Sequence, residues 1–355
     1  MADTRNATSR RLRRLGEMQK TEAVEGASRA LRDMWEAGSK PAEIVLRLEL
    51  IQRPDGERAP LTRLVLPRGI ALRFYLLALF EAQCRLDVNE PWANARPLTG
   101  VGSWSDFVAI DGAYHSASGT YMPDTKQERT GPDLRVRQVK SALDTLEKLG
   151  LERALAVVPR ARNGGRRLYE QFSLMKEGGR GGHQTPDTYT VPAPHWSART
   201  ITVPSNFFLM GWVQVLNPSE IATWLTLRAL SQWAREQHAE TGVYLYGKAR
   251  KEDFGLRRDA WEDGCNMLRG FGLLRHARAS ALDADPKKGL SASIDLVDHF
   301  AREMRERYEP YRWQVIDQRL NEDAMKICTK ELTLRKKQLD LAAKQRAQGK
   351  KSSTT

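Results

Sequence analysis

The feature of this sequence that most restricts its fold is an internal repeat. Residues 146–153 (LEKLGLER) match residues 268–275 (LRGFGLLR), with a constant shift of 122. The same shift brings residues 171–174 (QFSL) onto residues 293–296 (SIDL). Two matches at one offset are hard to obtain from helical composition alone, so the sequence predicts a duplicated unit.

In each copy the residue pattern predicts three helices followed by a β-hairpin. The third helix of the first copy has apolar residues three and four apart, which form one face. Gly150 then fits a C-terminal cap, and Asn163-Gly164 between two strand-like runs is a strong hairpin signal. The expected helices are 69–86, 104–110 and 133–149 in the first copy and 217–237, 250–254 and 258–271 in the second. The expected strands are 154–158 and 167–175, a second hairpin has its tip at 285–289, and strand-like runs precede the copies at 63–66 and 200–203.

This order of elements resembles a winged helix-turn-helix. Residues 250–261 (RKEDFGLRRDAW) and 268–274 (LRGFGLL) are similar to that family's second helix, turn, third helix and entry to the wing. The resemblance covers about residues 60–176 and 199–297, and an insertion over about 111–130 departs from it. Two such units with a basic N-terminal arm look like plasmid replication initiators of the tandem winged-helix type. The resemblance implies that the third helix enters the DNA major groove and that the wing contacts the backbone or minor groove.

The expected fold is therefore mainly α with small β-hairpin wings (α+β), comprising two winged-helix domains in tandem plus long N- and C-terminal helices. Glycine and proline clusters between the copies indicate a flexible linker. The expected divisions are 1–59 (basic arm and helix), 60–176 (first winged helix), 177–198 (linker), 199–297 (second winged helix) and 298–355 (charged helix and basic tail).

A long charged helix is expected from Tyr311 to about Gln345, followed by a disordered tail over 344–355. Its apolar residues repeat every seven positions, but the companion positions three residues later are mostly charged, so only half of a coiled-coil seam is present. Packing on the domains and self-association are therefore equal alternatives. The repeating residues are Trp313, Leu320, Ile327, Leu334 and Leu341.

The net charge of +13 suits a negatively charged partner. Residues 1–20 hold six basic and two acidic side chains and residues 329–355 hold eight and two, so the ends supply +10 of this charge. Basic ends attract any polyanion. Specific DNA binding must therefore depend on the basic side chains of the middle elements.

The third helix of the first copy presents donors that can reach phosphates and purine edges. The equivalent positions of the second copy hold Asp259, Ala260 and Asp263, with Glu262 adjacent, which phosphate would repel. The first copy is expected to be the principal reader, and the second either a weaker reader or a contact for protein. The candidate DNA-binding residues on the third helix of the first copy are Arg135, Arg137, Gln138, Lys140 and Ser141.

Further candidate DNA-binding residues lie on the wings, on the second copy and in the N-terminal arm. Arginine forks bind phosphate at two points and fit a narrow minor groove. The first wing offers Arg160, Arg162, Arg166 and Arg167, and the arm offers Arg10, Arg11, Arg13 and Arg14. The second copy offers Lys248, Arg250, Lys251, Arg257, Arg258, Lys287 and Lys288.

No motif for catalysis or metal binding is present in the sequence. The six histidines are scattered without HExxH, and the three cysteines are far apart without CxxC, so we expect them to be reduced and mostly buried. The sequence thus predicts no enzymatic activity, no cofactor and no metal. No apolar run approaches the ~18 residues that cross a bilayer, and the N-terminus lacks a signal-type apolar stretch. A cytoplasmic protein without membrane contact is expected.

The expected function is binding of double-stranded DNA at a defined site, with Arg137, Gln138 and Lys140 reading bases. Plasmid or phage replication initiation is the first context, and transcriptional regulation through the same interface is the alternative. An adaptor that binds a protein partner, with nonspecific DNA affinity from its basic ends, is an alternative of another class. A nuclease or recombinase subunit is a third, which the lack of a carboxylate or histidine motif counts against.

Overall fold

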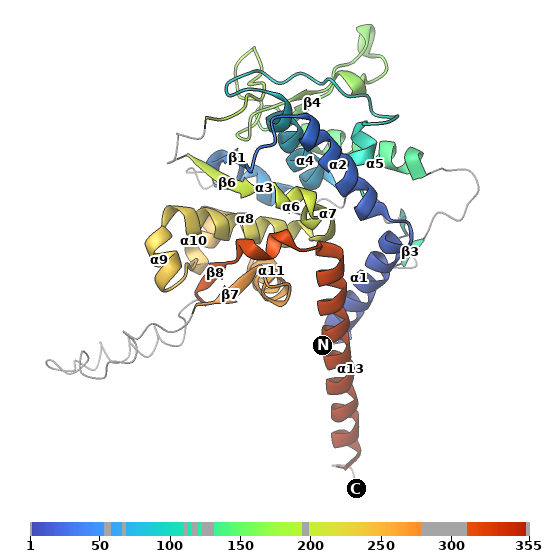
Figure 1. The fold of residues 1–355 in the computed structure, drawn as a ribbon, viewed down its shortest axis with the longest axis vertical. Coiled ribbons are helices and arrows are strands. Elements are labelled where there is room, and N and C mark those ends of the chain that lie inside the picture. Colours follow the sequence, from blue (N-terminus) through green and yellow to red (C-terminus); the bar gives the residue numbers. More distant parts are fainter. Residues whose placement is uncertain are drawn as a thin grey trace, which may run out of the picture.

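The computed structural model shows a mainly helical protein with small antiparallel sheets, which is the expected α+β class (Figure 1). The structure describes residues 2–52, 58–65, 69–109, 113–115, 120–122, 131–193, 199–277 and 311–352.

The helices and strands follow one another along the chain as numbered in Figure 1. The α-helices are α1 (Ala2–Lys20), α2 (Ala23–Ala37), α3 (Pro60–Arg63), α4 (Ala71–Arg85), α5 (Gly131–Glu147), α6 (Asn206–Leu209), α7 (Trp212–Val215), α8 (Pro218–Trp233), α9 (Arg235–Glu240), α10 (Gly247–Glu252), α11 (Arg258–Gly270) and α13 (Ala324–Ser352). The strands are β1 (Glu43–Arg47), β2 (Ala113–His115), β3 (Thr120–Met122), β4 (Ala156–Val157), β5 (Ser173–Leu174), β6 (Thr200–Pro204), β7 (Leu274–His276) and β8 (Trp313–Val315). The 3-10 helices are η1 (Leu48–Leu50), η2 (Trp104–Phe107), η3 (Arg162–Gly164), η4 (Tyr169–Gln171) and η6 (Asp317–Asn321).

The two halves of the chain share an order of elements. In the first half α5 packs on α4, which is buried along nearly its whole length because apolar residues surround it on every face. In the second half α11 packs on α8, which begins at the expected Asn217 with a capping box closed by Glu220. A short helix precedes each third helix, η2 before α5 and α10 before α11, and an antiparallel strand pair follows each. One continuous apolar core runs through both halves.

A two-stranded ladder joins the halves at their centre. Strand β1 pairs antiparallel with β6, and Val45 lies opposite Thr202. The amide of Gln83 on α4 accepts a hydrogen bond from Val45 N and donates one to Val45 O, both at 2.7 Å. The amide of Gln232 on α8 makes the same two bonds with Thr202, both at 2.9 Å. The outer edge of β1 is therefore bonded by a glutamine of α4, and the outer edge of β6 by a glutamine of α8, with the same pair of backbone hydrogen bonds.

The register of the repeat changes after the third helix. Leu151 and Leu273 match in the sequence, but Leu151 is 82% exposed whereas Leu273 is fully buried. Leu155 takes the equivalent place, because its N–H donates to Leu146 O as that of Leu273 donates to Leu268 O. The constant shift of 122 thus describes the third helices and fails at the strands.

The second strand pair differs from the expected hairpin. β7 pairs with β8, so residues 313–315 form a strand where a helix was expected, and α13 begins only at Ala324. The expected hairpin tip at 285–289 lies outside the described residues. The expected strand over 63–66 is also wrong, because Arg63 ends α3, whereas the expected strand over 200–203 is confirmed as β6. Within the expected insertion, β2 and β3 pair antiparallel.

Residues 177–193 are not the flexible linker that their glycines and prolines suggested. Tyr189 and Glu177 are fully buried, and Tyr189 N donates to Leu174 O beside β5. Gly179 adopts a positive φ of 110°, and a Cβ there would lie 2.6 Å from Glu152 O. The glycines therefore allow tight turns against the first half.

The N-terminal helices and α13 pack across the domains. The expected single N-terminal helix is broken at Glu22, which has a left-handed φ of 51°, into α1 and α2. Helix α2 contacts η2 and α4 of the first half and α6 of the second, and α1 lies beside α13 (Figure 1). Leu332 is buried, but Leu334 and Leu341 are 44% and 59% exposed, so the expected seven-residue repeat does not form one buried face. Helix α13 continues to Ser352, so the expected disordered tail is helical up to that residue.

Close packing of α11 on α8 depends on Gly264. A Cβ at this position would lie 2.5 Å from Thr223 Oγ1, and Thr223 is fully buried on α8. Replacing Gly264 with alanine is therefore expected to lower the free energy of unfolding by about 1–3 kcal/mol. Gly26 in α2 is the matched control, because nothing lies within 4 Å of a Cβ there, and Gly26→Ala is expected to stabilise the protein by roughly 0.5–1 kcal/mol. Urea unfolding of both variants checks this, and equal stability would contradict the close helix contact.

Candidate nucleic-acid interface

Helix α5 presents one apolar face to the core and one polar face to solvent. Val139, Leu143 and Leu146 are fully buried, as their spacing predicted. Arg137 and Ser141, on the opposite side, are exposed, and Gln138 and Lys140 are partly buried. The candidate base-reading residues therefore lie along one helix, whose orientation is fixed by its packing on α4.

The strand pair β4–β5 and the loop between them form an arginine-rich hairpin, as expected, but the strands are shorter than predicted. The expected strand over 154–158 is reduced to β4, and the expected strand over 167–175 is reduced to β5 because η4 interrupts it. Ala156 lies opposite Leu174, and a further bridge pairs Arg160 with Arg167. Gly164 has a φ of 69°, as the Asn-Gly turn requires. Three arginines around the tip are exposed: Arg160, Arg162 and Arg166.

Arg167 has a different role from the one expected of it. Its guanidinium pairs with Asp144 at 2.9 Å and with Glu147, both on α5. Glu147 also accepts a hydrogen bond from Val158 N at 3.0 Å, and Tyr169 OH donates to Asp144 at 3.0 Å. Arg167 thus holds the hairpin against the C-terminal half of α5 and leaves little of its guanidinium for a phosphate.

Two other candidates on α5 have internal contacts. The Lys140 ammonium lies 5.6 Å from the centre of the Tyr169 ring, which also faces Arg167 at 5.5 Å. Burial raises the pKa of Tyr169, and the hydrogen bond with Asp144 raises it further. Arg135 lies 3.9 Å from Asp106 of η2, a loose pair that leaves the side chain 34% exposed. Arg135 and Lys140 remain partly accessible.

The third helix of the second half carries mixed charges. Asp259, Glu262 and Asp263 are exposed on α11, and Glu262 pairs with Arg258 at 2.7 Å. Arg250 is partly buried, and its Nε has no hydrogen-bond partner among the described residues. The exposed candidates of this half are Lys248, Lys251, Arg257 and Arg258, whereas Lys287 and Lys288 lie outside the described residues.

The N-terminal arginines divide into two pairs. Arg10 and Arg13 are exposed on α1, but Arg14 is buried and the side chain of Arg11 is only 9% exposed. Arg11 makes two hydrogen bonds with Glu220 on α8, at 2.5 and 2.8 Å, and lies over the ring of Phe271. Burial acts to lower the pKa of Arg11, but the Glu220 carboxylate more than offsets it, so the pKa is raised. Arg11 and Arg14 are therefore structural residues, and the expectation that they form a DNA-contacting arm is wrong.

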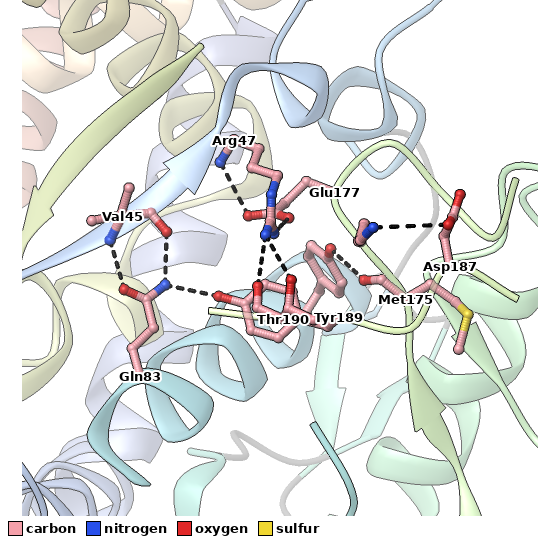
Figure 2. Close-up of polar contacts among 10 residues, drawn as sticks. Val45, Arg47, Gln83, Met175, Glu177, Asp187, Tyr189 and Thr190 are labelled. Atoms are coloured by element: carbon pink, nitrogen blue, oxygen red, sulfur yellow. Dashed lines mark hydrogen bonds and ion pairs between the residues drawn. The ribbon is translucent and has the colours of Figure 1, made fainter. Parts of the chain in front are cut away.

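A buried polar network in the first half was not visible in the sequence (Figure 2). Arg47 on β1 donates to Glu177 at 2.7 Å and to Thr190 O at 2.8 Å, and its guanidinium lies over the Tyr189 ring. Gln83 bridges Val45 and the hydroxyl of Tyr189, as Figure 2 shows. Burial raises the pKa of Glu177, and the nearby Arg47 guanidinium lowers it in part. These contacts hold Glu177, Tyr189 and Thr190 against β1 and α4.

Other chemical features can be judged only for the part of the chain that the structure describes. There, no group of three His, Cys, Asp or Glu side chains is placed to hold a metal ion, and no helix is long and apolar enough to cross a bilayer. The three cysteines are free and buried, as expected, and burial raises the pKa of Cys84 to about 12.

No known protein family, curated protein or solved structure matches this chain.

Proposed function

We propose that this chain binds double-stranded DNA at a defined sequence through α5 and the β4–β5 hairpin, in the manner of a winged helix. The observation that carries the proposal is the distribution of charge on this surface. Asp144 and Glu147, the carboxylates in the C-terminal half of α5, are both paired with Arg167. Arg137 on the helix and Arg160, Arg162 and Arg166 on the hairpin are left exposed.

The geometry supports reading of bases as well as attraction to phosphate. A helix that is buried on one face and polar on the other can enter a major groove, where arginine and glutamine side chains distinguish purines. The clamp formed by Arg167 fixes the hairpin relative to the helix, so that both would meet one duplex together. We infer that α5 reads bases and the hairpin arginines hold the backbone.

Replication initiation on a plasmid or phage replicon is the biological context we propose, because two similar halves in one chain resemble tandem winged-helix initiators. Transcriptional regulation through the same interface is the second context. The acidic face of α11 is the main support for the adaptor hypothesis. Part of that face borders basic residues of the same chain instead of being open to a protein partner, since Asp263 lines a cleft with Arg10 and Arg14 of α1. No catalytic role is part of the proposal.

Selection from a random duplex library tests the proposal. The full chain is expected to enrich one sequence motif at about 150 mM salt, where weak surface attraction is screened. Because α1 is packed into the protein, the control is the double variant Arg10→Ala and Arg13→Ala, which keeps the helix and removes its exposed charge. The same motif should be enriched by this variant. Binding without any enriched motif, lost in the variant, would contradict specific reading and favour the adaptor.

A further inference from the structure

A cleft of about 530 Å³ lies where the two ends of the chain meet the second half. It is bounded by α1, the N-terminus of α8, α11 and α13, which are brought together by the packing of α1 on α13. Its charged lining consists of Arg10, Arg11, Arg14, Arg335, Glu220 and Asp263.

The charges in this cleft do not cancel. Arg11 and Glu220 neutralise each other through their two short hydrogen bonds. Arg10 makes no hydrogen bond or ion pair with the described residues, and the contact of Arg335 is with the sulfur of Met267 at 3.1 Å, a weak acceptor. Asp263 is the carboxylate that remains opposite them. Two arginine side chains, Arg10 and Arg335, therefore line the cleft with one carboxylate to offset them, which makes the cleft attractive to an anion.

Two further features of the cleft favour an anionic ligand. Asn217 and Ser219 line it at the N-terminus of the 16-residue helix α8, where the helix dipole is positive. The side chain of Arg11 is nine-tenths buried, and its Nε has no acceptor among the described residues. The wall is not entirely polar, because Met267 and Leu332 also line it. The volume falls in the range of small-molecule sites, roughly 300–1,000 Å³.

We propose that this cleft binds a small phosphorylated ligand of nucleotide size, with Arg10 and Arg335 donating to its phosphates. Guanidinium groups fit phosphate oxygens at two points, which a lysine does not. The ligand ties α1 and α13, from opposite ends of the chain, to α8 and α11. This binding does not require the proposed DNA interface, which lies on α5 and the β4–β5 hairpin.

Isothermal titration of the full chain with ATP, without magnesium and at about 150 mM salt, tests the site. The double variant Arg10→Ala and Arg335→Ala is expected to weaken ATP binding by roughly tenfold or more, since it removes the two guanidinium groups proposed to donate to the phosphates. Arg13→Ala with Lys336→Ala is the matched control. It removes the same charge from exposed neighbours on the same two helices that do not line the cleft. Its affinity should stay within about twofold of the wild type.

A second pair of variants removes a negative charge instead of a positive one. Asp263→Asn is expected to tighten ATP binding several-fold, whereas Asp259→Asn, exposed on the same helix outside the cleft, should leave it unchanged. Tripolyphosphate should compete with ATP, and adenosine should not. Equal effects of both double variants, or no ATP binding at millimolar concentration, would overturn the proposal. Displacement of ATP by a short DNA duplex, with the same sensitivity to Arg10 and Arg335, would overturn it by assigning the cleft to the DNA backbone.

Discussion

Replacing Glu177 with alanine is expected to lower the free energy of unfolding by about 3–5 kcal/mol. The carboxylate is fully buried and accepts from Arg47 N at 3.0 Å and from Arg47 Nη1 at 2.7 Å. Its removal leaves the Arg47 charge largely inside the protein, with the oxygens of Thr190 and the face of the Tyr189 ring as its remaining partners. An uncompensated charge is costly here because the Arg47 side chain is only 16% exposed, so water can solvate it only in part.

Two control variants separate charge from packing in this prediction. Glu177→Gln keeps an oxygen acceptor and should cost less than the alanine variant. Replacing both partners, with Arg47→Met and Glu177→Leu, removes the charges together and is expected to lie close to the wild type. Urea unfolding measures all three, and an alanine variant within about 1 kcal/mol of the wild type would show that the pair contributes little.

The same carboxylate should make the stability of the folded protein depend on pH. Burial raises the pKa of Glu177 above its usual value, so the folded protein holds this proton more tightly than the unfolded chain does. This contribution to stability is present below the usual glutamate pKa and is lost as the pH rises through the raised value. The unfolding free energy of the wild type minus that of Glu177→Gln should therefore fall as the pH rises from the usual glutamate pKa through the raised pKa of Glu177.

The helices that the sequence predicted correctly are of two kinds. Helices α5 and α11 have one apolar face, whereas α4 and α8 come from strongly apolar runs and are buried along most of their length, although the predicted end of α8 was four residues too late. The ladder between β1 and β6 was missed because its two strands lie far apart in the chain. The glutamines that hold it, Gln83 and Gln232, are 149 residues apart, so the repeat offset of 122 does not relate them.

Other errors arose where one composition fits two structures. Gly179 and Gly181 suit a flexible linker and a tight turn equally, and only the buried Glu177 and Tyr189 beside them decide between the two. The apolar spacing from Trp313 suits a helix, yet pairing with β7 makes that segment a strand. A run of arginines likewise does not reveal which of them face a carboxylate.

The candidate site was predicted in outline by the exposed polar face of α5 and the arginines of the hairpin. The sequence did not reveal which of those arginines pair with carboxylates and which remain exposed. Arg167 differs from Arg160, Arg162 and Arg166 only because Asp144 and Glu147 lie one helical turn apart on α5 and face it. That contact joins residues about twenty positions apart and has no signature in the sequence.

Replacing Arg137 and Gln138 with alanine is expected to weaken binding to the selected duplex by ~1–3 kcal/mol at a base position that they read. Arg137 is exposed and Gln138 partly buried on α5, whose packing uses other residues, so unfolding should change little. Fluorescence anisotropy with the selected duplex and with single-base variants of it measures the effect. In the variant protein, discrimination between bases at one position of the duplex should be reduced.

Arg162→Ala is the matched control for that measurement, because Arg162 lies on the hairpin and is expected to contact phosphate. It should weaken binding to every duplex to a similar degree and lower the slope of log affinity against log salt by ~1. The contrast between the two variants identifies the reading element. If the α5 variant weakened selected and scrambled duplexes equally, α5 would be only a source of charge, and specificity would have to come from another surface. If it changed neither, the DNA interface proposed on α5 would be wrong, and a protein partner would become the better explanation for its exposed face.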